Sequence, residues 1–268
     1  MTRVLPMLVL AALPLLATTD EDWRALYYKG QQLAVEKSFA RAESVYAEAL
    51  NKAELFGKDD VRVASTEQAL GETLRGDKKL SDAEAALQRA VNIYAVTPGD
   101  SSIEFAEAQF DLAGVLMDEG KYQSALQSLN LLLPIFDKNL DPRDSKLAAG
   151  LCMQGDTYRM LKRYASAETS LKRCADILTE NGAIGTASFG EATNSLAIVY
   201  QRLGQTADAD RYFTFAAKIR EQALGIGSPE LADTLEAHAA LLHQMGRDAE
   251  AKQKEKMAAA IRAHSAKK

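Results

Sequence analysis

The sequence contains few residues that break helices, with only 16 glycines and 6 prolines among its 268 residues. Alanine, leucine, glutamate and glutamine are abundant, and all four favour helix. This composition predicts a chain that is helical almost throughout.

Blocks of basic residues are missing as well. The formal net charge is −5, and the one short basic run is Lys267-Lys268 at the very end. A nucleic-acid-binding surface normally shows as a basic patch or stripe. The charge pattern therefore argues against a nucleic-acid partner.

Long hydrophobic runs are absent after the first residues. Residues 1–17 combine Arg3 with an apolar run from Val4 to Leu16, and a polar stretch begins at Thr18. This pattern is typical of a signal peptide cleaved after Ala17. A membrane anchor is the alternative, but a span needs about 20 apolar residues. We expect a bacterial exported protein, periplasmic or secreted, with no membrane span after cleavage.

Catalytic motifs are also lacking: there is no phosphate loop, dinucleotide fingerprint or nucleophile elbow. His238 and His243 are five residues apart, so they do not share a helix face as metal ligands at i and i+4 would. We predict solvated or edge-packed histidines, no metal, no cofactor and no enzyme activity.

The chain does contain an internal repeat, which is the first signal to seek in a helical sequence. Each copy has a small residue, an apolar residue three later and an alanine nine further, and in all but the last copy an apolar residue follows four after that. Small residues let two helices approach closely, and the apolar residues fill the contact between the two helices, which we call the seam. The copies are Gly30-Leu33-Ala42-Tyr46, Gly71-Leu74-Ala83-Leu87, Ala113-Leu116-Ala125-Leu129, Gly155-Tyr158-Ala167-Leu171, Ala197-Tyr200-Ala209-Phe213 and Ala239-Leu242-Ala251-Glu255.

The positions of the small residues set the period, since 30, 71, 113, 155, 197 and 239 differ by 41 and then by 42 four times. The aromatic residues Tyr46, Tyr158, Tyr200 and Phe213 fall in seam slots, so we expect them in the core.

These slots resemble the tetratricopeptide repeat, and the 42-residue period resembles the repeats of kinesin light chains. The stretches 224–232 and 193–197 are similar to the linker and to the first-helix start of that subgroup. Glu67 and Glu255 depart from the apolar pattern, and Glu255 suits a terminal repeat whose outer face meets water. The resemblance implies an all-α fold, a right-handed superhelical solenoid of six antiparallel helix pairs.

The predicted organisation is a signal peptide over 1–17, six repeats over 18–258 and a C-terminal tail over 259–268. The repeats are expected at about 23–60, 61–101, 102–143, 144–186, 187–227 and 228–258.

In the resembled family, the first helices of the repeats line a groove that holds the partner. In that family, the positions three before the small residue and one, four and five after it face the groove. The residues at these positions in this chain form a predicted protein- or peptide-binding face. Arg75, Arg159 and Arg202 are hypothesised to clamp carboxylates or backbone carbonyls, and Asn194 to read peptide backbone. The predicted groove residues are Tyr27, Gln31, Gln68, Glu72, Arg75, Phe110, Met117, Asp156, Arg159, Asn194, Gln201 and Arg202.

Two cysteines, Cys152 and Cys174, fall in the fourth copy, early in its first helix and late in its second. An exported protein can form a disulfide, and antiparallel packing brings the two levels together. Cys174 occupies a buried seam slot, however, whereas Cys152 occupies a slot that the family turns to the groove. A disulfide and two separate small apolar residues both remain open.

The sequence therefore predicts an exported interaction scaffold. An alternative is an accessory subunit of an envelope export or glycan-handling assembly, and an enzyme is the least supported reading. Self-association is a further hypothesis, because the open ends of such a stack are apolar unless capped and Trp23 lies near one of them.

Overall fold

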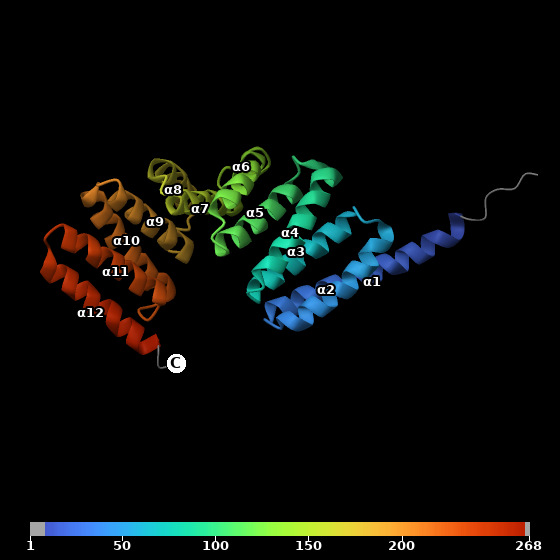
Figure 1. Ribbon diagram of the computed structural model, residues 1–268, viewed down its shortest axis with the longest axis horizontal. Helices are drawn as coiled ribbons and strands as arrows, with labels where there is room; N and C mark the ends of the chain where they lie inside the picture. The colour runs from blue at the N-terminus through green and yellow to red at the C-terminus, as the bar shows by residue number, and fades with distance from the viewer. Residues whose placement is uncertain (1–8, 266–268) are drawn as a thin grey trace, which may run out of the picture. The chain divides into compact units, whose positions relative to one another are not determined.

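The computed structural model describes residues 9–265, with side chains from Asp20 onward, and within that range it contains helices and no strand (Figure 1). Each odd-numbered helix is followed by its antiparallel partner, which confirms the predicted all-α fold of paired helices. The helices are α1 (Val9–Val35), α2 (Phe39–Ala53), α3 (Val61–Gly76), α4 (Leu80–Tyr94), α5 (Ile103–Asp118), α6 (Tyr122–Asn139), α7 (Ser145–Met160), α8 (Tyr164–Glu180), α9 (Ala187–Arg202), α10 (Thr206–Leu224), α11 (Pro229–Gln244) and α12 (Asp248–Ser265).

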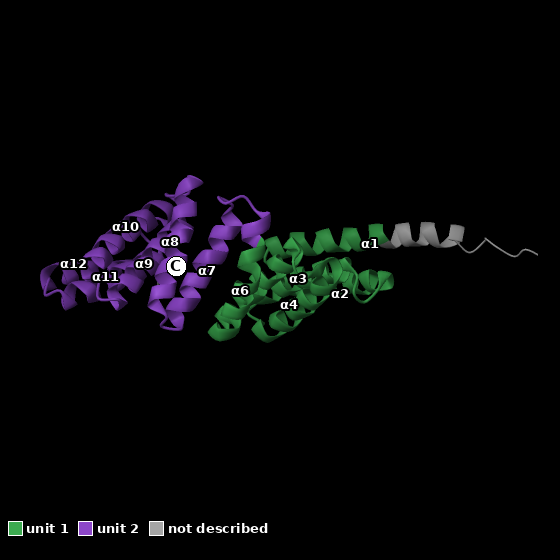
Figure 2. Ribbon diagram, turned by 90° about the horizontal axis from the view of Figure 1, so that it is seen from above, with its two compact units in different colours: residues 1–135 green, residues 136–268 purple. Residues whose placement is uncertain are grey.

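The chain divides into two compact units, residues 1–135 and 136–268, which Figure 2 colours separately. Unit 1 contains α1 to α5 and most of α6. Unit 2 contains the end of α6 and α7 to α12. Each unit is described by itself.

Close contact between paired helices depends on the small residue of each repeat. A Cβ atom added to Gly71 would lie 2.5 Å from Cγ of Leu87, and one added to Gly155 would lie 2.5 Å from Cγ of Leu171. Gly30 stands in the same relation to Tyr46. The small residue and the apolar residue sixteen positions later are therefore direct contacts across each of these helix pairs.

The first helices start at regularly spaced caps. The cap side chains accept a hydrogen bond from a backbone N–H two or three residues later, which satisfies one of the free donors at a helix start. Successive caps are 42 residues apart, so the cap belongs to the repeat. They are Asp60, Ser102, Asp144, Thr186 and Ser228.

The turn between the two helices of each pair also repeats. One residue of every turn has a positive φ angle, a conformation that costs little for glycine and more for other residues. Three copies use Gly120, Gly204 and Gly246, with φ between 73° and 77°. The other three copies place Lys37, Lys78 and Lys162 there, with φ between 56° and 64°.

The predicted seam aromatics lie in or against the core of their units. Tyr46 and Phe213 are 1% and 0% exposed, Tyr200 is buried, and Tyr158 is half-buried against the same cluster as Phe213. Glu67, which departs from the apolar pattern, is buried and forms an ion pair with Arg89.

The predicted repeat boundaries up to residue 228 all fall between helix pairs. The boundary at 258 falls inside α12, so residues 259–265 of the predicted C-terminal tail continue that helix, with Ile261 buried. Residues 1–8 of the predicted signal peptide and 266–268 of the tail lie outside the described residues. The predicted cleavage position lies within α1, and cleavage remains a prediction. None of the helices in the described range is long and apolar enough to cross a bilayer.

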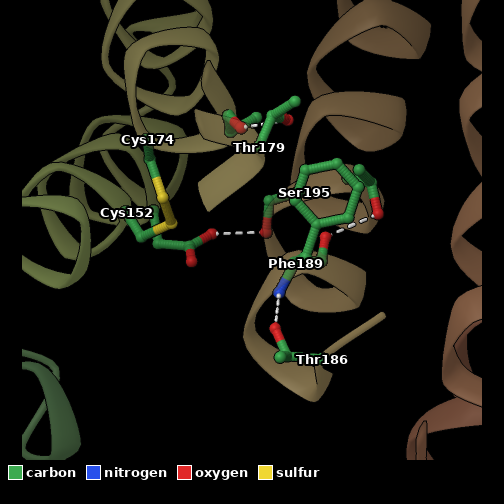
Figure 3. The surroundings of a disulfide bond; sticks show 9 residues. Cys152, Cys174, Thr179, Thr186, Phe189 and Ser195 are labelled. Atoms are coloured by element: carbon green, nitrogen blue, oxygen red, sulfur yellow. Dashed lines mark hydrogen bonds between the residues drawn. A yellow bond between two sulfur atoms is a disulfide. The ribbon is translucent and has the colours of Figure 1, made fainter. Parts of the chain in front are cut away.

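Cys152 on α7 and Cys174 on α8 form a disulfide, with their Cα atoms 5.4 Å apart (Figure 3). Of the two alternatives that the sequence left open, the structure has the bridge. Cys174 is fully buried in the seam, and Cys152 is half-buried on the facing helix. Because α7 and α8 run antiparallel, a residue early in α7 lies beside a residue late in α8.

The prediction of solvated or edge-packed histidines is wrong for His238. This side chain is 2% exposed, stacks on Phe213 with ring centroids 5.6 Å apart, and places Nε2 2.6 Å from Oδ1 of Asp210. Asp210 also forms an ion pair with Arg247. His243 is exposed and contacts two carboxylates, one of them from Glu255.

Candidate partner-binding site

The predicted groove residues lie on the first helices, and several contact the next first helix of the same unit. Nε2 of Gln68 on α3 donates to Oδ2 of Asp111 on α5 over 2.6 Å. In unit 2, Nε2 of Gln201 on α9 donates to Oε1 of Gln244 on α11 over 3.0 Å. Both contacts join residues 43 apart in sequence. Within each unit, consecutive first helices are therefore joined by a polar contact between residues of this face.

Tyr27 and Gln31 lie at the start of this face in unit 1. Tyr27 is half-buried, stacks on Trp23 with centroids 5.3 Å apart, and accepts a hydrogen bond from Gln31. Nε1 of Trp23 donates to the hydroxyl of Thr66 on α3 over 3.0 Å. Tyr27 thus belongs to an aromatic cluster that joins α1 to α3. It is not an isolated exposed anchor.

Phe110 and Met117 lie on α5 in the same unit. Phe110 is half-buried, and Met117 packs against the hydrophobic core beside the seam. Met117 therefore contributes mainly to the core of unit 1.

A hollow of about 510 Å³ opens between α3 and α5. We call it the acidic hollow, because three carboxylates line it against two cations. The ion pair of Arg75 with Asp118, 2.7 Å between Nε and Oδ2, already uses one of those cations. The lining residues are Glu72, Arg75, Gly76, Lys78, Asp111 and Asp118.

Two of these carboxyl groups lie close enough to oppose each other's ionisation. Burial, and then the neighbouring Glu72, raise the pKa of Asp111 to about 7. Burial also raises the pKa of Glu72. Two adjacent carboxyl groups resist simultaneous ionisation, so near neutral pH this site favours a proton or a cation.

Two of the three predicted arginine clamps are held by carboxylates of the chain itself. The Arg75 guanidinium pairs with Asp118 and lies over Gly114, where a Cβ atom would collide with it. Nε of Arg159 donates to Oδ1 of Asp156 over 2.9 Å, and Asp156 also accepts from Ser195 over 2.8 Å, the bond drawn in Figure 3. A partner carboxylate would have to displace these internal ones.

The remaining predicted groove residues, Asn194 and Arg202, both lie on α9. Arg202 is exposed at the C-terminal end of the helix. Asn194 is half-buried, and its side-chain oxygen has no hydrogen-bond partner within the described part of the chain.

Three features of this face were not predicted from the sequence: Asp111, Asp118 as the partner of Arg75, and Ser195 as the partner of Asp156. Asp111 lies two positions before the small residue Ala113, outside the inward slots that the family resemblance supplied. A search for complementary polar residues 43 apart would have found its contact with Gln68. No residues in the described range form a cluster of histidine, cysteine and carboxylate side chains suited to a metal ion.

Comparison with known proteins agrees with this arrangement. A tetratricopeptide repeat family model matches residues 104–180 and 189–263, more than half of the chain. Protein KINESIN LIGHT CHAIN-RELATED 2 of Arabidopsis thaliana is 27% identical over 177 residues, which is 63% of this chain. The chain spans only 25% of that relative's length.

Solved structures share the fold at low sequence identity. The TPR-like repeats of a putative kinesin light chain from Podosopora anserina match with a TM-score of 0.63 and 16% identity, covering 74% of this chain and 94% of that one. A Rap protein complexed with Competence and Sporulation Factor matches with a TM-score of 0.57 and 19% identity, covering 92% of this chain and 76% of that one. This chain belongs to the tetratricopeptide repeat family, and its 42-residue repeats are of the kinesin light chain-like type.

Proposed function

We propose that this protein is an exported scaffold that binds a segment of a partner protein along its first helices. The acidic hollow of unit 1 anchors a lysine or arginine of that segment. The observation that carries the proposal is the hollow itself, in which Glu72, Asp111 and Asp118 outnumber Arg75 and Lys78.

A cationic side chain suits this hollow for an electrostatic reason. Asp111 and Glu72 are adjacent carboxyl groups, and a positive charge between them relieves their repulsion. Arg75 supplies only part of that charge: it acts against the rise in the pKa of Glu72, but its guanidinium is paired with Asp118. An arginine of a partner would form charge-assisted hydrogen bonds with the remaining carboxylates, which are about twice as strong as neutral ones.

The family supports protein binding in general. A Rap protein with a similar fold has been solved in complex with Competence and Sporulation Factor. In the described part of the chain, His238 and His243 contact carboxylates, and Cys152 and Cys174 are bridged.

Export is supported by two independent features. The apolar run ending at Leu16 is typical of a signal peptide, and disulfides persist in oxidising compartments. Cell fractionation followed by N-terminal sequencing of the mature protein tests this part. An intact N-terminus on cytoplasmic protein with both thiols free would contradict it.

Peptide binding tests the hollow directly. Fluorescence anisotropy would compare an arginine-containing peptide with a glutamate-containing peptide of the same length. We expect the cationic peptide to bind more tightly, with an affinity that falls as salt rises.

The Glu72→Lys variant should weaken binding of the cationic peptide about tenfold or more. Asp82→Lys is the matched control, because it makes the same charge change at an exposed position on second helix α4. Equal binding of both peptides, or equal loss in both variants, would rule out the acidic hollow as the anchor.

A further inference from the structure

A second hollow, of about 560 Å³, lies among the last three helices of unit 2. We call it the terminal hollow. Leu231 and Leu235 of α11 line it together with Ala217 of α10 and Met257 and Ile261 of α12. It lies between the second helices α10 and α12 and over α11, and none of the predicted groove residues lines it.

The preceding repeat has a smaller hollow, of about 400 Å³, at the equivalent place. Phe189 and Phe215 line that hollow, and their rings meet edge to face with centroids 6.0 Å apart. Leu231 and Met257 follow these two residues at the 42-residue step. Replacing two aromatic rings by Leu and Met accounts for the larger space in the last repeat.

The charged residues at the rim also differ between the smaller hollow and the terminal hollow. Asp176 and Tyr212 line the smaller hollow, and the residues 42 positions later in the terminal hollow are Lys218 and Lys254. Neither lysine forms an ion pair within the described part of the chain, in contrast to Lys79, Lys121 and Lys172. His264 and Glu221 also line the rim. The two lysines and Glu221 together give the rim one excess positive charge.

The interior of the terminal hollow favours a ligand without internal polar groups. Its floor and walls are aliphatic, and the hydroxyl of Thr214 already donates to the carbonyl of Asp210. A peptide backbone placed there would leave N–H and C=O groups without partners, at a cost of roughly 1–3 kcal/mol for each group. A hydrocarbon chain incurs no such cost.

We propose that the terminal hollow binds a free fatty acid, with its acyl chain over Leu231 and Leu235 and its carboxylate beside Lys218 and Lys254. This binding is independent of the partner segment proposed for unit 1, because it uses other helices and another unit.

Isothermal titration calorimetry with dodecanoate, below the concentration at which it forms micelles, tests the proposal. We expect saturable binding of one dodecanoate per chain and much weaker binding of dodecyltrimethylammonium, which has the same chain and the opposite charge. The double variant Lys218→Ala/Lys254→Ala should bind dodecanoate at least about tenfold more weakly.

A matched pair of variants distinguishes binding in this hollow from non-specific hydrophobic binding. Met257 and Phe215 occupy the same slot in successive repeats, and both are 42% exposed. Met257→Glu should abolish dodecanoate binding, whereas Phe215→Glu should leave it unchanged, with helix content by circular dichroism preserved in both.

Equal binding of the cationic and anionic amphiphiles would overturn the proposal, and so would wild-type affinity in Met257→Glu. Co-sedimentation with anionic phospholipid vesicles, without binding of free dodecanoate, would overturn it in favour of a membrane contact.

Discussion

Units 1 and 2 are built from the same repeat but surround their ionisable groups with different neighbours. In unit 1, Asp111 lies beside another carboxyl group, that of Glu72. In unit 2, Asp210 lies between His238 and Arg247. A repeat that controls backbone geometry therefore leaves the electrostatics of each copy free to differ.

The two arrangements give opposite responses to pH. The folded-state pKa of Asp111 is about 7, above its ordinary value of 3.8, so folded unit 1 holds a proton that the unfolded chain releases. Its stability falls as pH rises between those values. Burial lowers the pKa of His238 below its ordinary value of 6.5, so the unfolded chain binds that proton more readily. Unit 2 therefore loses stability as pH falls below 6.5.

The largest expected difference between the units comes from the disulfide, which only unit 2 contains. Replacing Cys152 and Cys174 by alanine opens a loop with a sequence separation of 22 and should cost about 3 kcal/mol of unfolding free energy. Urea unfolding followed by circular dichroism reports both units, and the fluorescence of Trp23, the one tryptophan, reports unit 1. An equal loss in both signals would show that the units unfold together.

The second effect concerns the buried histidine. His238→Leu removes a partner of Asp210 and should cost about 2 kcal/mol at pH 8. It should also flatten the loss of stability between pH 7 and pH 5 that we expect for unit 2. His243→Leu, at an exposed position of the same helix, should change stability by less than about 0.5 kcal/mol. Urea titrations across this pH range check both, and an unchanged pH profile in His238→Leu would contradict the assignment.

The third effect concerns the carboxyl pair of unit 1. Asp111→Asn keeps the acceptor for Gln68 and removes the charge, so it should stabilise unit 1 by about 1 kcal/mol at pH 8. At pH 4, where the aspartate is protonated in the folded state, the gain should vanish. Urea unfolding followed by Trp23 fluorescence measures it, with the exposed Asp82→Asn as the control. A gain that did not depend on pH would point to a cause other than proton binding.

The last effects concern the turns, and one of them is the smallest that we expect. Lys162→Gly should stabilise unit 2 by about 0.5 kcal/mol, because glycine adopts the positive φ angle without strain. Gly204→Ala, at the same slot of the next repeat, should destabilise it by about 1 kcal/mol. Thermal unfolding of both variants checks the pair, and shifts in the same direction would contradict a shared backbone requirement.

Most of the fold could be predicted from the sequence, because its determinants repeat at a constant step. Gly71 and Leu87, for example, are a small and a large apolar residue sixteen positions apart. This spacing predicts that they meet across a pair of helices, as they do. Local patterns of this kind identified the seam and the repeat boundaries up to residue 228. The boundary at 258 between the last repeat and the tail lies within α12, which continues to Ser265 with Ile261 buried.

The candidate site was harder to predict, because its chemistry depends on contacts between repeats. The family slots pointed to Arg75 and Arg159 as free clamps, but each is paired with an aspartate. No sequence pattern marked Asp111 as a site residue, because an isolated aspartate on a helix is ordinarily a solvated charge.

By itself, the sequence determined the helical composition, the period, the small residues in the seam and the family, because each rests on residue types at fixed spacings along one or two helices. Only the tertiary structure decided that Asp111 meets Glu72, that His238 is buried against Asp210 and that Cys152 reaches Cys174. It also decided that the terminal hollow is larger than the equivalent hollow of the preceding repeat. Those features depend on which side chains the packing brings within a few ångströms, and no spacing along the chain specifies that.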